Sequence, residues 1–209
     1  MRTVVPHGDL GQTFTEAARR AQIIQAAIDT VAEVGFARAS LAQIGARIGI
    51  SKGLIGYHFA GKEDLIKQVV LEIIEQGKAY MQPRILAHSN GPDMLRAYIE
   101  SNLEFVKEHR NHMLAIAEIA RNGVSADGVP VQTGADVDAA VHALEGLLAR
   151  LQAIGELRSD FDPRVMAVLI RAAIDAVPRR LAHDPNLDVG KYATEITNVF
   201  GLATRPAHP

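Results

Sequence analysis

One short stretch of the chain carries four side chains that can donate hydrogen bonds to phosphate: Lys52, Tyr57, His58 and Lys62. Ammonium, imidazole and phenol groups often hold nucleic-acid backbones, because they donate to phosphate oxygens. Gly53 lies among them and has no side chain, so a phosphate could approach the backbone closely there. The residue types and their spacing indicate binding of a polyanion.

The elements that must position these residues are two short helices joined by a tight turn. Ser40 is a good N-cap for the first helix, and an apolar stripe follows it at helical intervals. Gly45 allows the second helix to approach closely, and Gly49, at the turn, tolerates a positive φ. Ser51 then caps the second helix. This layout predicts a helix-turn-helix, whose second helix enters the DNA major groove.

The second helix divides into two faces. Ile55 and Phe59 are predicted to face inward. The outward positions are Lys52, Gly53, Leu54, Tyr57 and His58. An ordinary helical hairpin is the alternative, but a purely structural hairpin has no reason to carry these residues on its outer face.

At these residues the chain resembles a known family. The segment Ser51-KGLIGYHFAGKED-Leu65, preceded by Gly35-FARASLAQIGARIG-Ile50, is similar to the DNA-binding domain of TetR-family transcriptional regulators. The resemblance covers about the first third of the chain. The rest is similar only in being an all-helical segment of the usual length. It implies a homodimer with about nine helices per subunit, in which a small ligand in the C-terminal domain changes the spacing of two DNA-binding heads. It also implies that Lys62 faces a phosphate.

One position departs from the family pattern. Family members usually carry a tyrosine that commonly contacts a phosphate, and this chain has Gly56 there. The departure predicts one backbone contact fewer and a larger role for Tyr57 and His58. Gly53 and Gly56 also make this helix intrinsically poor, since each glycine is about 1 kcal/mol less favourable than alanine.

Composition fits a small DNA-binding head followed by one larger helical domain. The 209 residues include no cysteine, which excludes disulfides and thiolate metal sites. No stretch has the length of a signal peptide core or a membrane span, so we expect a cytoplasmic protein without a membrane partner. The net charge is −2, yet residues 1–70 hold eight Lys and Arg against six Asp and Glu. A mildly basic head must depend on a few placed contacts and on dimerisation.

The sequence predicts an all-α fold with three parts: a flexible arm over 1–14, a helix-turn-helix domain over 15–65, and a helical ligand-binding and dimerisation domain over 66–209. The first helix is expected from Glu16 to Val34, capped by Thr15 and ended by Gly35. Arg19 and Arg20 lie near its start, where one could reach a phosphate or both could form a solvated basic pair.

Beyond residue 65 the periodicity is helical throughout. Helices are expected at about 62–80, 93–109, 111–121, 136–157, from 163 onward and 189–202. Pro83 and then Ser89-Asn90-Gly91-Pro92 mark a break, and a loop is expected over 122–134. Asp162 and Pro163 start a helix that is apolar on too many sides for a surface helix, with a kink at Pro178. We expect this helix and the last one to pair with their copies in a four-helix interface. The alternative is that they complete the monomer core.

The effector pocket is expected among the middle helices, as the resemblance implies. Large apolar, aromatic or adaptable side chains are the candidates: Phe105, Met113, Ile116, His142, Leu147, Met166 and Ile170. Arg171 and Asp175, one helical turn apart, either pair with each other or supply the polar group of the pocket. Plain core packing is the alternative for each candidate.

Enzyme and metal chemistry have little support. His109 and His112 place two imidazoles on one helical face, but a zinc site needs three or four converging ligands. HExxH, GxSxG and P-loop motifs are missing from the sequence. We therefore expect no catalytic residue, no metal and no cofactor.

The residues and the resemblance together predict a ligand-responsive transcriptional regulator. It would act as a repressor that binds a palindromic operator as a dimer and is released by a small apolar or amphipathic effector. The expected DNA contacts are Arg19, Ser40, Lys52, Gly53, Leu54, Tyr57, His58 and Lys62. Of these, Lys52 and Leu54 are expected to meet base edges. The alternative function is a helical protein-interaction module without DNA binding.

Overall fold

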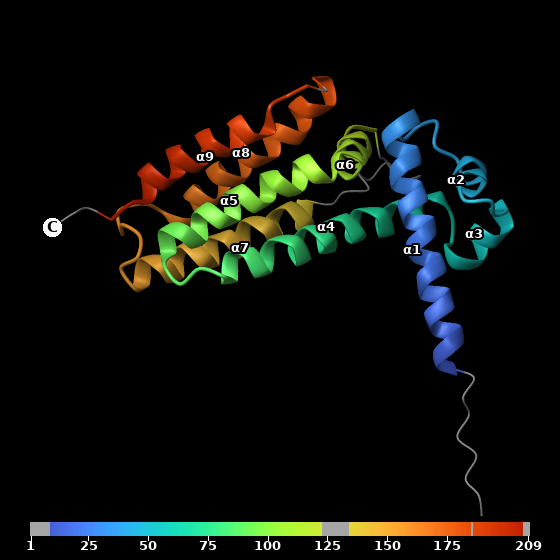
Figure 1. Cartoon of the computed structure of the whole chain (residues 1–209), viewed down its shortest axis with the longest axis horizontal. Helices are drawn as coiled ribbons and strands as arrows, with labels where there is room; N and C mark the ends of the chain where they lie inside the picture. Colours follow the sequence, from blue (N-terminus) through green and yellow to red (C-terminus); the bar gives the residue numbers. More distant parts are fainter. Residues whose placement is uncertain (1–8, 123–133, 185, 207–209) are drawn as a thin grey trace, which may run out of the picture.

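Helices make up all the regular structure in the part of the chain that is described. The computed structural model describes residues 9–122, 134–184 and 186–206, and within these ranges it contains nine helices. Figure 1 shows a small head at one end and a longer helical body at the other. The predicted all-α fold with an N-terminal helix-turn-helix is confirmed.

The head consists of α1 (Asp9–Val34), α2 (Leu41–Arg47) and α3 (Lys52–His58), and α4 (Lys62–Leu86) leads from it into the body (Figure 1). Helix α1 begins earlier than the sequence predicted. Thr15 lies inside it and is not its N-cap, and the expected arm is helical from Asp9 onward. Residues 1–8 of that arm lie outside the described residues.

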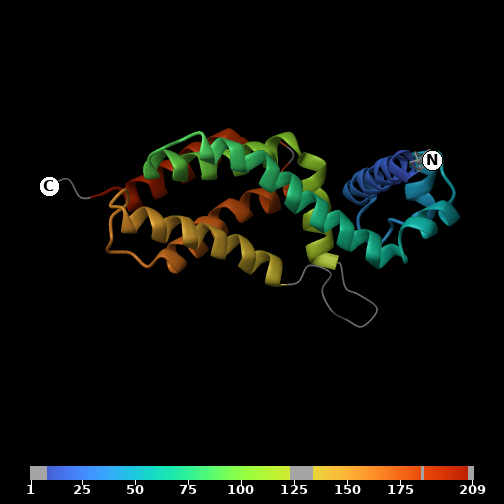
Figure 2. The same ribbon diagram turned by 90° about the horizontal axis from the view of Figure 1, so that it is seen from below.

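The body contains α5 (Gly91–Glu108), α6 (Arg110–Asn122), α7 (Gly134–Ala153), α8 (Pro163–His183) and α9 (Val189–Thr204). In Figures 1 and 2, α5, α7, α8 and α9 run along the length of the body, and α6 lies at the end that faces the head. The predicted loop over 122–134 falls almost wholly on residues outside the described ranges. None of the described helices is long and apolar enough to cross a membrane.

Side-chain caps explain where the body helices start. The carboxylate of Asp162 accepts a hydrogen bond from the Val165 amide (3.0 Å), as predicted, and Asn90 accepts one from Asp93 (2.9 Å) at the start of α5. The predicted break at Ser89-Asn90-Gly91-Pro92 is confirmed, since α5 begins at Gly91, but the break does not start at Pro83, since α4 continues to Leu86. Pro83 lies in the last turn, where its missing N–H removes only one helical hydrogen bond.

Helix α4 shares its buried face between the head and the body. Leu65, Ile66 and Val69 are fully buried, and Ile73 follows on the same stripe. These residues belong to one continuous apolar core that extends from Ile23 of α1 to Val189 of α9. Helix α4 therefore packs in the head and in the body with one continuous buried face.

Candidate DNA-binding interface

The start of α2 is fixed by a reciprocal cap. The Ser40 hydroxyl accepts a hydrogen bond from the Gln43 amide (3.3 Å), and the Gln43 side chain accepts one from the Ser40 amide (3.0 Å). This capping box satisfies two amides that have no partner inside the helix. The Ser40 hydroxyl also donates to the Gln43 side-chain oxygen (3.1 Å), and a phosphate at this position would compete for that donated hydrogen bond.

The turn between α2 and α3 requires glycine at two positions. A Cβ added at Gly45 would lie 2.6 Å from the Ile50 carbonyl oxygen, a distance that real Cβ atoms essentially never show. Gly49 has φ +68°, in the left-handed region that side chains rarely adopt. The predicted close approach at Gly45 and the predicted positive φ at Gly49 are both confirmed.

Helix α3 is held at its start and along its inner face. The Ser51 hydroxyl accepts a hydrogen bond from the Leu54 amide (3.2 Å), which confirms the predicted N-cap. Ile55 is fully buried, and Phe59 is 2% exposed. These contacts leave the opposite face of the helix free.

The outer face of α3 is exposed as the sequence predicted, except at His58. Lys52 and Gly53 are exposed, Leu54 is 39% exposed and Tyr57 is 75% exposed. The expected outward orientation of His58 was wrong in part. Its side chain is half-buried, and its Nδ1 is buried without a hydrogen-bond partner. The reason is that residue 58 ends the helix beside the buried Phe59.

Gly56 faces open space. A Cβ built there would meet no atom within 4 Å, whereas one at Gly53 would make an ordinary contact with the Ser51 hydroxyl oxygen at 3.7 Å. The protein itself therefore does not require glycine at position 56.

Three basic residues around α3 are engaged within the head. Lys62 Nζ donates to the Phe36 carbonyl oxygen (2.7 Å) and lies 4.5 Å from the Phe36 ring centroid. Burial lowers the pKa of Lys62. Arg19 donates to Gln22 (2.9 Å), and Arg20 donates to the His58 carbonyl. Lys62 thus ties α4 to the loop after α1, although its ammonium keeps two further N–H groups for a phosphate.

The candidate effector residues mostly lie in the body core. Phe105, Met113, Leu147, Met166 and Ile170 are buried, and Ile116 is half-buried. His142 was expected in the pocket but is exposed, on a face of α7 where its Nε2 lies 3.1 Å from the guanidinium of Arg164.

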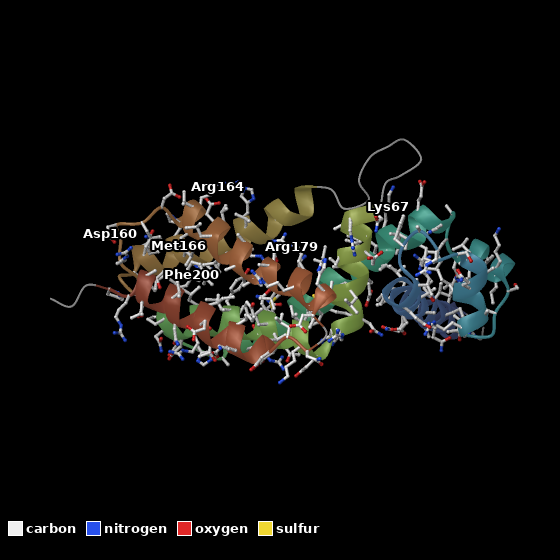
Figure 3. The ribbon with its side chains drawn as sticks, turned by 90° about the horizontal axis from the view of Figure 1, so that it is seen from above. Lys67, Asp160, Arg164, Met166, Arg179 and Phe200 are labelled. Atoms are coloured by element: carbon white, nitrogen blue, oxygen red, sulfur yellow. The ribbon has the colours of Figure 1, made fainter. Side chains whose placement is uncertain are left out.

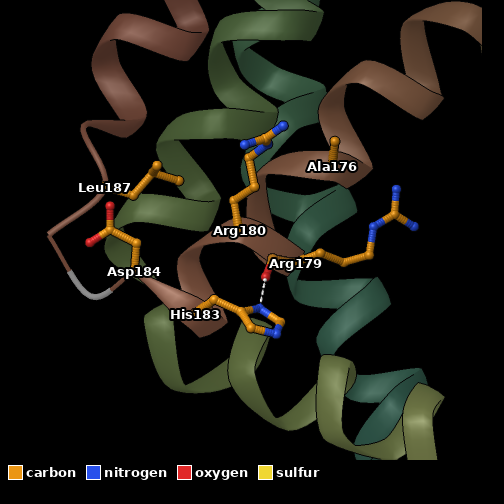
Figure 4. Close-up of a pocket in the computed structure, with 6 residues that line it drawn as sticks. All are labelled: Ala176, Arg179, Arg180, His183, Asp184 and Leu187. Carbon is orange, nitrogen blue, oxygen red and sulfur yellow. Dashed lines mark hydrogen bonds between the residues drawn. The ribbon is translucent and has the colours of Figure 1, made fainter.

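Two surface hollows lie away from these candidates. One, of about 560 Å³, is lined by Ala176, Arg179, Arg180, His183, Asp184 and Leu187 at the end of α8 (Figure 4). The other, of about 550 Å³, lies between the end of α1 and α6. None of the nine predicted effector residues lines either hollow.

A partly buried polar network joins α8 to α5. Arg171 donates to the Tyr98 hydroxyl (3.2 Å) and to the Asn102 side-chain oxygen (2.9 Å), and it also pairs with Asp175. Burial alone lowers the pKa of Arg171, but Tyr98 and Asp175 more than offset this and raise it. Arg171 and Asp175 therefore pair with each other, one of the two predicted alternatives.

His109 and His112 lie where α6 packs on α4 and α5. His112 Nε2 lies 3.0 Å from the Gln76 side-chain oxygen, and the His109 ring stacks on Phe105 with centroids 4.1 Å apart. Among the described residues, no group of three His, Asp or Glu side chains could hold a metal ion.

Helix α6 also contacts the head directly, at two polar points that the sequence did not signal. The Asn111 side chain donates to Asp29 of α1 (2.9 Å), and the Phe36 amide donates to Glu118 (3.4 Å). Each pair is 82 positions apart in the sequence, so no local pattern could reveal it.

Comparison with known proteins places residues 23–69 within a family model described as "Bacterial regulatory proteins, tetR family". The regulator BetI 1 of Chromohalobacter salexigens is 34% identical over 87 residues, which are 41% of this chain and 43% of that protein. BetI of Cronobacter sakazakii is 32% identical over 99 residues, 46% of this chain and 49% of that protein. The chain thus matches less than half the length of these curated relatives.

Solved structures share the fold over most of the chain. FadR of Bacillus halodurans superposes with a TM-score of 0.79 at 17% identity, covering 90% of this chain and 97% of that one. FadR of Bacillus subtilis, in complex with stearoyl-CoA, gives 0.74 at 20% identity and covers 86% and 96%. SmeT, the repressor of a multidrug efflux pump of Stenotrophomonas maltophilia, gives 0.73 at 23% identity and covers 89% and 90%.

Proposed function

We propose that this chain is a ligand-responsive, DNA-binding transcriptional regulator of the TetR family that works as a homodimer. The match of residues 23–69 to the tetR family model supports this proposal. The observation that carries the proposal is the exposed outer face of α3 on a tightly packed helix-turn-helix. Its Lys52, Leu54 and Tyr57 are exposed while Ile55 is fully buried. A helix presented in this way can enter a major groove.

The outer face of α3 suggests a division of roles. Tyr57 and Lys52 would donate to phosphates, and Gly53 would allow a phosphate to approach the backbone. Lys52 and Leu54 would meet base edges, where Leu54 supplies an apolar contact. Arg19, Ser40 and Lys62 would contribute only where a phosphate can share or replace the partners that they have within the head. His58 would contribute only through the exposed part of its half-buried ring.

Exposed apolar side chains on α8 and α9 support a dimer. Large apolar residues of these helices are about half exposed or more: Val165 57%, Val168 46%, Leu169 52%, Val199 57% and Leu202 71%. In Figure 3, the labelled Met166 of α8 and Phe200 of α9 lie toward the end of the body away from the head. Apolar surface on two adjoining helices is typical of an interface, and a second copy would complete a four-helix packing.

A small molecule would act through the body. FadR of Bacillus subtilis was solved with stearoyl-CoA, which supports an apolar or amphipathic effector for this chain as well. The buried candidates Phe105, Met113 and Met166, with the Arg171 network beside them, would form its site. The ligand can shift the protein only through unequal affinity for the DNA-competent and incompetent arrangements of the heads. Release of DNA on ligand binding would make the protein a repressor, acting in the cytoplasm where operator DNA lies.

Selection from a pool of random duplexes tests the proposed function. The full chain is incubated with the pool at moderate salt, and the retained duplexes are sequenced over several rounds. The expected result is an enriched inverted repeat, because a two-fold symmetric dimer presents two copies of α3. A pool that stays unenriched would contradict the proposal and favour a helical interaction module.

A further inference from the structure

Arg20 of α1 reaches the C-terminal end of α3. Its Nη1 donates a hydrogen bond to the carbonyl oxygen of His58, the last residue of α3, although the two residues are 38 positions apart. The guanidinium carbon also lies 4.4 Å from the centroid of the Phe59 ring. One side chain therefore holds both the last residue of α3 and the residue that follows it.

Helix α3 depends on such contacts because it is a weak helix. It has seven residues, and two of them are glycine. The last carbonyls of any helix have no partner within it. In α3 the Ile55 carbonyl accepts from the Phe59 amide (3.0 Å), and the His58 carbonyl accepts from Arg20. A cation at this end is also favoured by the helix dipole.

The two ends of α3 are thus fixed by different means. Ser51 caps the start from within the helix-turn-helix, whereas Arg20 holds the end from a separate helix. Ile55 and Phe59 bury the inner face between these two ends. A guanidinium that both donates and stacks has a defined plane, so it restricts the direction of the helix axis.

We propose that Arg20 is a positioning residue for DNA recognition, which orients α3 by holding the His58 carbonyl and the Phe59 ring. Its guanidinium is directed into the head and does not serve as a phosphate ligand. The consequence for DNA binding rests on the proposed function, whereas the restraint on α3 is a property of the free protein.

The test compares Arg20→Met, Arg20→Lys and the control Arg38→Met. Arg38, in the turn after α1, also donates to a carbonyl, that of Val34 (2.7 Å), but Val34 ends α1 only four positions earlier and the contact does not touch α3. Amide hydrogen exchange of the free full-length protein is measured across residues 52–59. Affinity for a selected duplex and for random DNA is measured at several salt concentrations.

A positioning role predicts faster exchange in α3 for both Arg20 variants, with exchange in α1 and α4 unchanged. It also predicts that both Arg20 variants bind the selected duplex roughly tenfold more weakly than the parent, or weaker still. The dependence of affinity on salt and the affinity for random DNA should stay as in the parent protein, because no phosphate contact is lost. Arg38→Met should behave as the parent in every measurement.

Two results would overturn the role. Unchanged exchange in α3 for both Arg20 variants would show that the contact does not restrain the helix. A salt dependence reduced by about one phosphate contact for Arg20→Met but retained for Arg20→Lys would identify a phosphate ligand instead. Failure of the parent protein to bind any duplex would contradict the proposed function. Because amide exchange is measured without DNA, the exchange result would still show whether Arg20 restrains α3.

Discussion

The Tyr57 side chain is largely exposed and takes no part in the core of the head. It is 75% exposed, and its described ring contact is an edge-on approach to His58 with centroids 5.1 Å apart. Neighbouring positions 55 and 59 are filled by core residues. A large phenol in this position has room to meet a phosphate, which is the role proposed for it.

The variant Tyr57→Ala should weaken operator binding while leaving the fold intact. A hydrogen bond to a charged group contributes about 1.5–3 kcal/mol, so the dissociation constant should rise by roughly one to two orders of magnitude. Fluorescence anisotropy with a labelled selected duplex measures the affinity, and thermal unfolding checks the fold. The control Leu86→Ala changes a side chain that is 66% exposed on α4. Equal affinity of Tyr57→Ala and the parent would remove Tyr57 from the interface.

Two glycines of the same motif should respond to alanine in opposite ways. At Gly45 a Cβ would lie 2.6 Å from the Ile50 carbonyl oxygen, so Gly45→Ala should destabilise the protein by about 1–3 kcal/mol or more. At Gly56 a Cβ meets nothing within 4 Å, so Gly56→Ala should stabilise it by up to about 1 kcal/mol. Denaturant unfolding of the two variants beside the parent measures both effects. A shift of the free energy of unfolding in the same direction for both substitutions would contradict this expectation.

Among the elements, α6 connects three parts of the molecule. It packs on α1 through Asn111 and Asp29, holds the Phe36 amide through Glu118, and places His112 against Gln76 of α4. His112 therefore lies where a change in charge would disturb the packing between α4 and α6.

Stability should fall as the pH drops below about 6.5, in part because of His112. Burial lowers the pKa of His112, and His109 lowers it further against the opposing effect of Asp29 and Glu72. The unfolded chain then takes up a proton at a higher pH than the folded protein. The contribution of His112 to the free energy of unfolding is thus complete above the pKa that it has in the unfolded chain. It is lost as the pH falls toward the lower pKa that it has in the folded protein.

Guanidinium unfolding between pH 7.5 and 5 checks this expectation. His112→Gln, which does not titrate and can still bond to Gln76, should show a flatter loss of stability than the parent. His183→Gln changes an exposed histidine at the end of α8 and should keep the parent profile. Identical profiles for His112→Gln and the parent would contradict the assignment.

Sequence patterns predicted the helix starts that are fixed by contacts between residues close together in the sequence. Ser40, Ser51 and Asp162 were recognised as N-caps because a cap acts on an amide three residues away. The contact of Arg20 with His58 and that of Lys62 with Phe36 join positions 38 and 26 residues apart, and they depend on how the helices pack. No periodicity encodes such contacts. The candidate DNA face could therefore be predicted from the sequence, whereas the contacts of Arg20 and Lys62 that hold it in place could not.

At the scale of the whole molecule, one continuous core links the head to the body, and α8 and α9 carry the exposed apolar side chains that are proposed as the dimer face. A single mildly basic head offers few phosphate contacts, so two linked heads are needed for tight and specific binding. In the proposed function, dimerisation is therefore part of how the protein recognises its operator.

The variant Leu169→Glu should convert the protein to a monomer. Leu169 is 52% exposed on α8, and a carboxylate at this position would be buried unpaired in the proposed interface. Sedimentation velocity should show the dimer dissociating at concentrations at least tenfold higher than for the parent. Leu71→Glu is the matched control, since Leu71 is 48% exposed on α4. A variant at position 169 that remains as dimeric as the parent would place the interface elsewhere.

The most direct test of paired recognition is the spacing between the half-sites of a selected duplex. Five base pairs, about half a helical turn, are inserted between the two halves, which moves one half-site to the opposite face of the DNA. If two copies of α3 are held at a fixed separation, the insertion should reduce affinity to the level of a single half-site. Equal affinity for the original and the lengthened duplex would contradict recognition by a dimer with two positioned heads.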